Sequence, residues 1–175
     1  MKRLGLLRHA KSDWDDLALR DFDRGLNARG RTGAALMGRH IRDTGPAWDL
    51  VLASPAERVK RTLAASGLEV PVSWQPDAYL ADAGTLLGLV QRAPEDAAAV
   101  LLIGHNPGLH QLVLTLVAPE NEDALFDEAA EKFPTAAYAV LELAIDRWAD
   151  SAPGCGRLVH FARPRDLDPE LGPER

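Results

Sequence analysis

The sequence predicts a single three-layer α/β/α domain with a mostly parallel sheet and a C-terminal antiparallel hairpin. Short apolar segments alternate with helical segments through the first two thirds of the chain, which is the pattern of βαβ units. The last third instead holds two strand-like segments, residues 135–145 and 157–162, on either side of a turn. With 175 residues and no internal repeat or linker, the chain is long enough for one well-buried domain.

The composition is that of an ordinary globular protein, with 46% hydrophobic and 26% charged residues. The net charge is -6 and no basic stripe is present, so we expect no nucleic-acid partner. The apolar run at the N-terminus ends at Arg8, which is too short for a signal peptide, and no segment approaches the roughly 20 apolar residues of a membrane span. The one cysteine, Cys155, cannot form an internal disulfide. We therefore expect a cytoplasmic protein without membrane association.

The first three predicted elements are a strand, a loop and a helix. Residues 4–8 form a short apolar strand that stops at an Arg-His pair. Residues 13–25 are polar without a steady period, which is typical of a surface loop with solvated carboxylates. Asn27 can cap a helix over residues 28–41 that ends toward Thr44-Gly45-Pro46.

The next predicted unit is a strand, a helix and an edge strand. Residues 49–54 form a second buried strand, and Ser54-Pro55 opens a helix over residues 56–66 with Ser54 as its cap. Residues 69–74 form a third strand, and Pro71 indicates that this strand lies at a sheet edge or ends there.

A helix over residues 82–92 follows, capped by Asp82 or Thr85. Residues 98–103 form the most clearly buried strand of the chain, and a helix over residues 108–117 comes after it. This alternation of helix, strand and helix agrees with a parallel sheet covered by helices.

The remaining segments carry weaker signals. Residues 119–134 are acidic and irregular, with a helical turn near 125–130, and we expect a mobile insertion there. From Arg163 the chain contains three prolines and many charges. We therefore assign the domain to residues 1–165 and a loosely held tail to residues 166–175.

Four polar side chains follow the ends of predicted strands. Arg8 and His9 end the first strand, His105 follows the fourth, and Arg58 lies in the first turn of the helix after the second. Sites in doubly wound α/β folds collect at the carboxyl ends of the strands, so we expect these four residues to lie together. An unpaired charge in an apolar interior is costly, so Arg8 and His9 are either solvated or bound to an anion.

The chemistry of these four residues suits phosphoryl transfer. Arginine forks bind phosphate oxygens and stay charged at any workable pH, while a histidine near neutrality can act as nucleophile, acid or base. The competing interpretation is a metal site formed by His9, His105 and a carboxylate. Arginines would repel a cation, and no H-x-x-x-H or H-x-E-x-H spacing is present, so we expect neither a metal nor a cofactor.

Three motifs in this order resemble those of the histidine phosphatase (phosphoglycerate mutase-like) superfamily. Leu7-Arg8-His9-Ala10 resembles its Arg-His-Gly signature, with alanine in place of glycine, and Ser54-Pro55-Ala56-Glu57-Arg58 resembles its Ser-Pro-x-x-Arg motif. Gly104-His105-Asn106-Pro107 resembles the motif of its second histidine. The segment Phe133-Pro134-Thr135-Ala136 is similar to that of the small SixA-type phosphohistidine phosphatases.

The resemblance implies a role for each matched residue. His9 would be the nucleophile that forms a phosphohistidine intermediate, and Arg8, Arg58 and His105 would form the phosphate pocket, with Asn106 as a further contact. Residues 1–165 would then be a histidine phosphatase-like domain.

The general acid is where the sequence departs from the family pattern. Larger members carry a glutamate after the third strand, where this chain reads Asp77-Ala78-Tyr79-Leu80-Ala81-Asp82, and Asp77, Asp82, Asp15 or no residue at all takes that role. Alkyl phosphates need a proton on their leaving group, whereas a phosphoramidate nitrogen can already be protonated. This difference favours protein phosphohistidine as the substrate.

Two other functions remain open from the sequence. One is a small-molecule phosphomonoesterase of the same family. The other is a module that binds a phosphorylated partner without hydrolysing it, and such a module would tolerate His9→Gln, whereas an enzyme would not.

Overall fold

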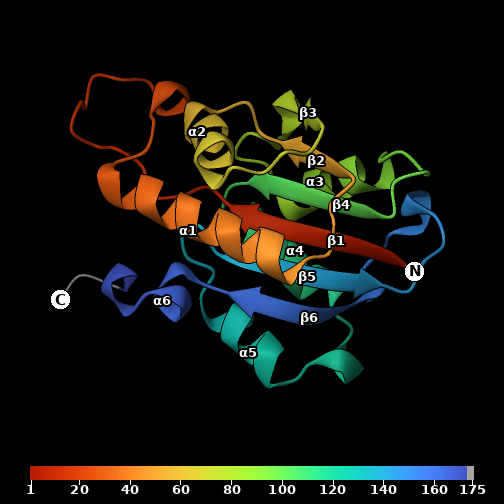
Figure 1. Cartoon of the computed structure of the whole chain (residues 1–175). Helices are drawn as coiled ribbons and strands as arrows, with labels where there is room; N and C mark the ends of the chain where they lie inside the picture. Colours follow the sequence, from red (N-terminus) through yellow and green to blue (C-terminus); the bar gives the residue numbers. More distant parts are fainter. Residues whose placement is uncertain (173–175) are drawn as a thin grey trace.

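The computed structural model describes residues 1–172, which form one sheet covered by helices on both faces (Figure 1). The strands are β1 (Lys2–Arg8), β2 (Leu50–Ala53), β3 (Val72–Trp74), β4 (Ala99–Gly104), β5 (Tyr138–Leu143) and β6 (Gly156–Ala162). The helices are α1 (Ala28–Thr44), α2 (Glu57–Ser66), α3 (Ala83–Gln91), α4 (Gly108–Leu116), α5 (Ala124–Glu131) and α6 (Pro164–Leu167). These elements confirm the predicted three-layer α/β/α class.

The six strands lie in the order β3-β2-β4-β1-β5-β6. The pairs β1–β4, β2–β4 and β2–β3 are parallel, and β5 is antiparallel to both β1 and β6. The sheet is therefore mostly parallel and ends in the predicted antiparallel hairpin. The edge position of β3 agrees with the proline that precedes it, because proline cannot donate to a central ladder.

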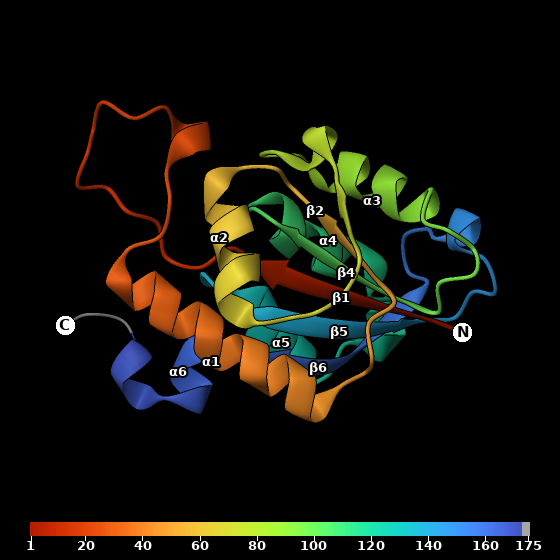
Figure 2. The same ribbon diagram turned by 45° about the horizontal axis from the view of Figure 1, so that its top comes forward.

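Apolar side chains of the sheet are buried on both faces, as expected where helices cover a parallel sheet. On one face Leu7 and Leu101 pack with residues of α1 and α2, such as Met37 and Val59. On the other face, side chains of the central strands pack against α3, α4 and α5, with Leu112 fully buried among them. Figure 2 shows the same division, with α1 and α2 on one side of the sheet and α3 and α4 on the other.

One local prediction needs correction. Ser54 is not the N-cap of α2: the helix begins at Glu57, its N-cap is Ala56, and the Ser54 hydroxyl accepts the Ala56 N–H at 3.3 Å and also contacts a histidine described below. The helical turn predicted near residues 125–130 is confirmed as the two-turn helix α5, whose Phe126 and Ala129 are buried, and the mobility of this segment stays a prediction. Burial of these two side chains against the sheet is the reason that the segment is helical.

The described part of the predicted tail lies beside α1 in Figures 1 and 2. Pro164–Leu167 forms α6 and Pro169–Leu171 forms a 3₁₀ turn. Residues 173–175 lie outside the described part of the chain, and the division between residues 1–165 and the tail remains a prediction.

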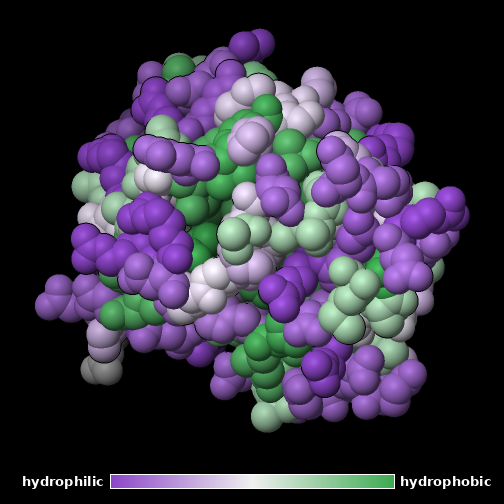
Figure 3. Space-filling view, turned by 45° about the vertical axis from the view of Figure 1, so that its right-hand side comes forward, coloured by the Kyte–Doolittle hydropathy of each residue, from purple (hydrophilic) through white to green (hydrophobic). Residues whose placement is uncertain are grey.

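The surface facing the reader in Figure 3 is mostly hydrophilic, with smaller apolar areas between the polar side chains. Within residues 1–172, no helix is long and apolar enough to cross a membrane.

Candidate active site

The ends of three neighbouring strands bring the predicted residues together. Arg8 of β1 is in register with Gly104 of β4, and Ala53 of β2 with Ile103 of β4. His9, Ser54 and His105 follow directly after these three strands. The backbone N–H of His9 also donates to the Gly104 carbonyl at 3.1 Å, which extends the ladder to the first site residue. The sheet register therefore fixes the backbone of the site.

The imidazole of His9 is held by a backbone carbonyl. Its Nδ1 lies 2.7 Å from the carbonyl oxygen of Ala10, and the side chain lines a cleft while only 7% of the residue is exposed. A carbonyl oxygen only accepts, so Nδ1 must carry the proton and Nε2 keeps its lone pair. Burial lowers the pKa of His9 to about 4, and the charges of Arg8 and Arg58 also lower it, against the Ala10 hydrogen bond. At neutral pH this imidazole is therefore neutral, with a lone pair on Nε2 that is chemically able to attack an electrophile.

The turn that follows His9 is tied to helix α2. The Ala10 N–H donates to the Thr62 hydroxyl at 2.9 Å, and that hydroxyl donates to the Arg58 carbonyl at 2.7 Å. Thr62 therefore links the carbonyl that orients His9 to the helix that carries Arg58. Ala10 itself is fully buried, so its methyl group fits where the family signature has glycine.

Arg58 is positioned by a residue that the sequence did not reveal. Its guanidinium donates to the Asp21 carbonyl at 2.8 Å and to the Asp21 carboxylate at 2.9 Å. The Tyr79 hydroxyl donates to the same carboxylate oxygen. Hydrogen bonds from Tyr79 and Arg58, and the Arg58 charge, hold the pKa of Asp21 below its usual range despite the opposing effect of burial. Asp21 is thus ionised at neutral pH.

The loop over residues 13–25 was predicted to carry mostly solvated carboxylates, and Asp21 is indeed exposed, but its carboxylate also binds Arg58, which the sequence did not indicate. Arg24 is buried and donates to the carbonyls of Asp13, Asp16 and Leu19, so one side chain organises the loop. The short 3₁₀ turn Asp21–Asp23 then reaches α2. No pattern within the loop signals this contact, because its partner Arg58 lies 37 residues away.

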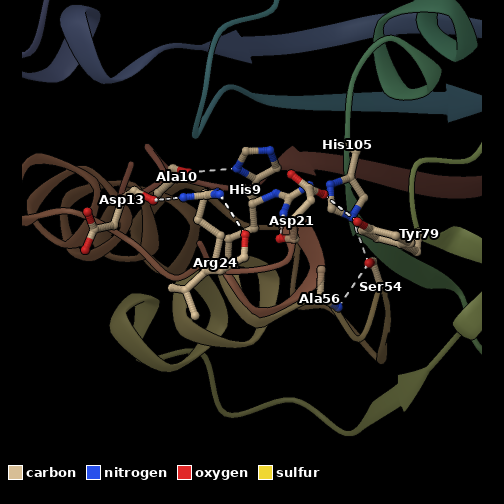
Figure 4. Close-up of polar contacts among 11 residues, drawn as sticks. His9, Ala10, Asp13, Asp21, Arg24, Ser54, Ala56, Tyr79 and His105 are labelled. Carbon is tan, nitrogen blue, oxygen red and sulfur yellow. Dashed lines mark hydrogen bonds and ion pairs between the residues drawn. The ribbon is translucent and has the colours of Figure 1, made fainter. Parts of the chain in front are cut away.

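The second histidine lies beside the first. The rings of His9 and His105 are 5.3 Å apart between centroids, and His105 Nε2 is 2.8 Å from the Ser54 hydroxyl. Burial lowers the pKa of His105 to about 3, helped by His9 and Arg58. Its Nδ1 is buried and has no partner among the described residues. Figure 4 shows His9, Asp21, Tyr79 and His105 gathered around one point.

Arg8 brings a positive charge without a carboxylate partner among residues 1–172. One of its terminal nitrogens donates to the Phe133 carbonyl at 3.3 Å, and its Nε is buried without a hydrogen-bond partner in the described chain. The amide of Asn106 donates to the same Phe133 carbonyl at 2.7 Å. A buried donor without a partner costs about 1–3 kcal/mol. An anion bound to the Arg8 guanidinium would therefore be stabilised both by the positive charge and by a hydrogen bond to this donor.

All five predicted site residues line one cleft of about 490 Å³. Lys11 and Lys132 add two more positive charges to its wall. Of the described residues, Asp21 is the one carboxylate that lines the cleft, and it is already paired with Arg58. The positive charges on its wall therefore make the cleft suited to bind an anion such as a phosphoryl group.

None of the three residues considered as general acids lines this cleft. Asp82 accepts the Thr85 N–H at 2.8 Å as the N-cap of α3, Asp77 lies in the 3₁₀ turn Pro76–Ala78, and Asp15 belongs to the loop before η1 (Asp21–Asp23). Asp21 cannot replace them as an acid at neutral pH, because its carboxylate is ionised and shared by Arg58 and Tyr79. In the described part of the chain, no group of three or more His, Cys, Asp or Glu side chains is arranged to hold a metal ion.

Comparison with known proteins now identifies the family. The family model of the histidine phosphatase superfamily (branch 1) matches residues 4–118, a range that contains Arg8, His9, Arg58 and His105. The chain belongs to this superfamily. Rv1276c of Mycobacterium tuberculosis, described as an uncharacterised protein, is 39% identical over 160 residues, which cover 91% of this chain and all of that relative.

Solved structures of SixA proteins share the fold of this histidine phosphatase. A protein from Nakamurella multipartitia, provisionally assigned as the phosphohistidine phosphatase SixA, superposes with a TM-score of 0.84 and 32% identity over 93% of this chain and 96% of that one. A protein from Agrobacterium tumefaciens with the same provisional assignment gives a TM-score of 0.77 and 30% identity over 93% and 98% of the two chains. The chain is therefore a phosphatase of the SixA type.

Proposed function

We propose that this phosphatase hydrolyses protein phosphohistidine through a covalent intermediate on His9, without a metal ion. The observation that carries the proposal is the geometry of His9. Its Nδ1 is occupied by the Ala10 carbonyl, which leaves a neutral Nε2 in a cleft with Arg8 and Arg58. The likeness to proteins assigned as SixA supports the substrate class.

The first step would transfer the phosphoryl group to the enzyme. The Nε2 lone pair of His9 attacks phosphorus, the new N–P bond forms, and the N–P bond to the substrate imidazole breaks. Arg8 and Arg58 stabilise the charge on the equatorial oxygens as it redistributes. The substrate leaves as a neutral imidazole when its other ring nitrogen already carries a proton. This step therefore needs no general acid, which agrees with the cleft, where the one described carboxylate, Asp21, is ionised and paired with Arg58.

The second step would transfer the phosphoryl group to water. The Nδ1–H of phosphorylated His9 stays hydrogen-bonded to the Ala10 carbonyl. The ring is therefore cationic while it carries the phosphoryl group and neutral once that group has been transferred to water. Water attacks phosphorus, a new P–O bond forms as the Nε2–P bond to His9 breaks, and both protons of the water leave with the product as dihydrogen phosphate. The carbonyl of Ala10 thus serves both steps by keeping one proton on Nδ1 throughout.

The chemistry of the leaving group favours phosphohistidine over an alkyl phosphomonoester. The alkoxide that leaves an alkyl phosphomonoester needs a proton in the transition state. The one carboxylate in the described cleft cannot supply it, because it is ionised and paired with Arg58. A phosphoramidate avoids that requirement. An aryl phosphate such as p-nitrophenyl phosphate lies between the two, because its phenolate leaves more easily than an alkoxide.

The test compares phosphate release from a phosphohistidine-bearing protein and from p-nitrophenyl phosphate, with EDTA present throughout. We expect the wild type to release phosphate from both, faster from the protein, and His9→Ala to release none. His40→Ala is the matched control, because His40 lies on α1 and does not line the cleft. Release from the aryl phosphate alone would favour a small-molecule phosphomonoesterase. Binding of the phosphoprotein without release would favour a binding module.

A further inference from the structure

A second cavity of about 400 Å³ adjoins the catalytic cleft. The two share a wall made by Lys11, Lys132, Pro134 and Thr135. The rest of this second cavity, called the basic groove below, is formed by the first turns of α1, the start of α6 and the residues up to Gly172. The groove therefore opens beside the position at which a bound phosphoryl group would lie.

Five cationic side chains line the basic groove: Lys11, Arg29, Lys132, Arg163 and Arg165. No carboxylate lines it in the described part of the chain. Arg163 is paired with Asp166 at 2.9 Å, whereas the other four make no ion pair with any described residue. The chain as a whole carries a net charge of -6, so the groove is a positively charged region on a protein that is negatively charged overall.

The shape and lining of the groove suit a polypeptide. Its cations come from the turn after β1, from α1, from the segment before β5 and from α6, with Pro134, Pro164 and Leu171 between them. Such a mixture of charged and apolar groups fits carboxylates and their methylene groups better than one compact anion. Gly33 leaves room in the groove. A β-carbon at this position would have one neighbour, the Pro164 side chain at 3.9 Å, and would otherwise occupy open space.

We propose that the basic groove binds an acidic segment of the substrate protein next to its phosphohistidine. The proposal rests on the proposed function for the phosphohistidine itself, and it adds that Asp or Glu residues on one side of that histidine are recognised. Because the two cavities share four lining residues, they lie side by side, and a single extended chain would place its phosphohistidine in one and its flanking residues in the other. Arg29, Arg163 and Arg165 would raise the rate of encounter and lower KM, and they would leave kcat unchanged because they line the groove and not the catalytic cleft.

The test uses two peptides that carry the same phosphohistidine and differ in their flanks, one with Asp and Glu and the other with Asn and Gln. The double variant R29Q/R165Q removes two cations that line the groove and not the catalytic cleft. R39Q/R157Q is the matched control, because both arginines are exposed, make no ion pair among the described residues, and line neither cavity. Net charge is the same in the two double variants.

We expect the wild type to have a KM about fivefold lower for the acidic peptide, and this preference to fall as salt rises. R29Q/R165Q should lose the preference while kcat and p-nitrophenyl phosphate hydrolysis stay as in wild type, and R39Q/R157Q should keep it. Gly33→Leu, which narrows the groove without changing charge, should raise KM for the acidic peptide. Equal KM values for the two peptides, or a preference that R29Q/R165Q retains, would overturn the proposal.

A binding measurement separates this proposal from the proposed function. Fluorescence anisotropy of the same acidic and neutral peptides, labelled and without phosphate, reports on the groove whether or not the enzyme hydrolyses phosphohistidine. Tighter binding of the acidic peptide that R29Q/R165Q abolishes would support the groove even if no phosphate were released. Equal binding of the two peptides would contradict the groove even if phosphohistidine were hydrolysed.

Discussion

The catalytic cleft and the basic groove are neighbours built on different principles. In the cleft, His9 and Arg58 are buried and held by the hydrogen bonds that they donate, His9 to the Ala10 carbonyl and Arg58 to the carbonyl and carboxylate of Asp21. In the groove, Arg29 and Arg165 lie outside the cleft, and no ion pair within the described chain holds them. Chemistry needs fixed geometry, whereas recognition of a flexible acidic segment needs only charge at the correct place. Substitutions in the cleft should therefore act on kcat, and substitutions in the groove on KM.

The largest loss of kcat is expected for a substitution of Arg58, the buried arginine that lines the cleft and not the groove. Arg58→Ala removes a charge that stabilises the transferring phosphoryl group and leaves Asp21 without its ion pair. We expect kcat to fall about 100- to 1000-fold. Arg165→Gln in the groove should leave kcat within about twofold of wild type. Steady-state kinetics on one phosphohistidine protein measures both, and similar losses of kcat in the two variants would remove the distinction between the regions.

Asp21 should have a smaller effect, because it acts through Arg58. Asp21→Ala leaves the Arg58 guanidinium without its carboxylate and lets it change orientation, so we expect kcat to fall about tenfold. Asp21→Asn keeps an oxygen that can accept from Arg58 and should recover most of the loss. A rise in p-nitrophenyl phosphate hydrolysis in Asp21→Ala would show instead that the carboxylate competes with phosphate for Arg58.

The buried histidines predict how stability depends on pH. The pKa of His9 is lowered to about 4 in the folded protein, below the value near 6.5 of an exposed histidine. Between these values the unfolded chain binds a proton that the folded protein does not, so the free energy of unfolding falls as pH decreases through this window. His9 alone should lower the free energy of unfolding by about 2 kcal/mol when the pH is lowered from 7 to 5. His105 acts in the same direction, because its pKa is also lowered.

Urea unfolding of wild type and His9→Ala at pH 7 and pH 5 measures this contribution. The variant should lose about 2 kcal/mol less stability than the wild type over that range. Activity should behave differently: kcat should stay level down to about pH 5, because Nε2 of His9 keeps its lone pair above its pKa of about 4. An equal pH dependence of stability in the two proteins would contradict the burial of a neutral His9.

Thr62 gives the smallest expected effect on catalysis. Thr62→Val removes the hydroxyl that accepts the Ala10 N–H and leaves that buried donor unpaired, at a cost of about 1–3 kcal/mol of stability. We expect kcat to fall only about threefold, since the sheet still positions the backbone of His9. Thr115→Val is the matched control, because Thr115 also donates to a carbonyl four residues earlier, but that hydrogen bond on α4 is exposed and the Thr115 hydroxyl accepts from no buried backbone N–H in the described chain. Equal losses of stability in the two variants would show that the Ala10 bond contributes nothing.

The sequence predicted the parts of the site that strands deliver directly. Arg8, His9 and His105 end or follow apolar strands, and the parallel register places them side by side. Asp21 and Tyr79 were missed because they reach Arg58 and each other through loop packing over long separations, which no local pattern encodes. Ser54 was assigned to a helix cap because local signals favour that role, but tertiary structure gives its hydroxyl to His105. The basic groove was also missed, because its cations come from four separate segments.

The central claim is that Nε2 of His9 carries the phosphoryl group during turnover. Rapid quenching of the enzyme with a phosphohistidine protein into alkaline denaturant, followed by peptide mass spectrometry and ³¹P NMR, identifies both the residue and the ring nitrogen. We predict phosphate on His9, attached at Nε2, because Nδ1 is bonded to the Ala10 carbonyl. Phosphate on His105, on Nδ1 of His9, or on no residue while turnover continues would contradict the account.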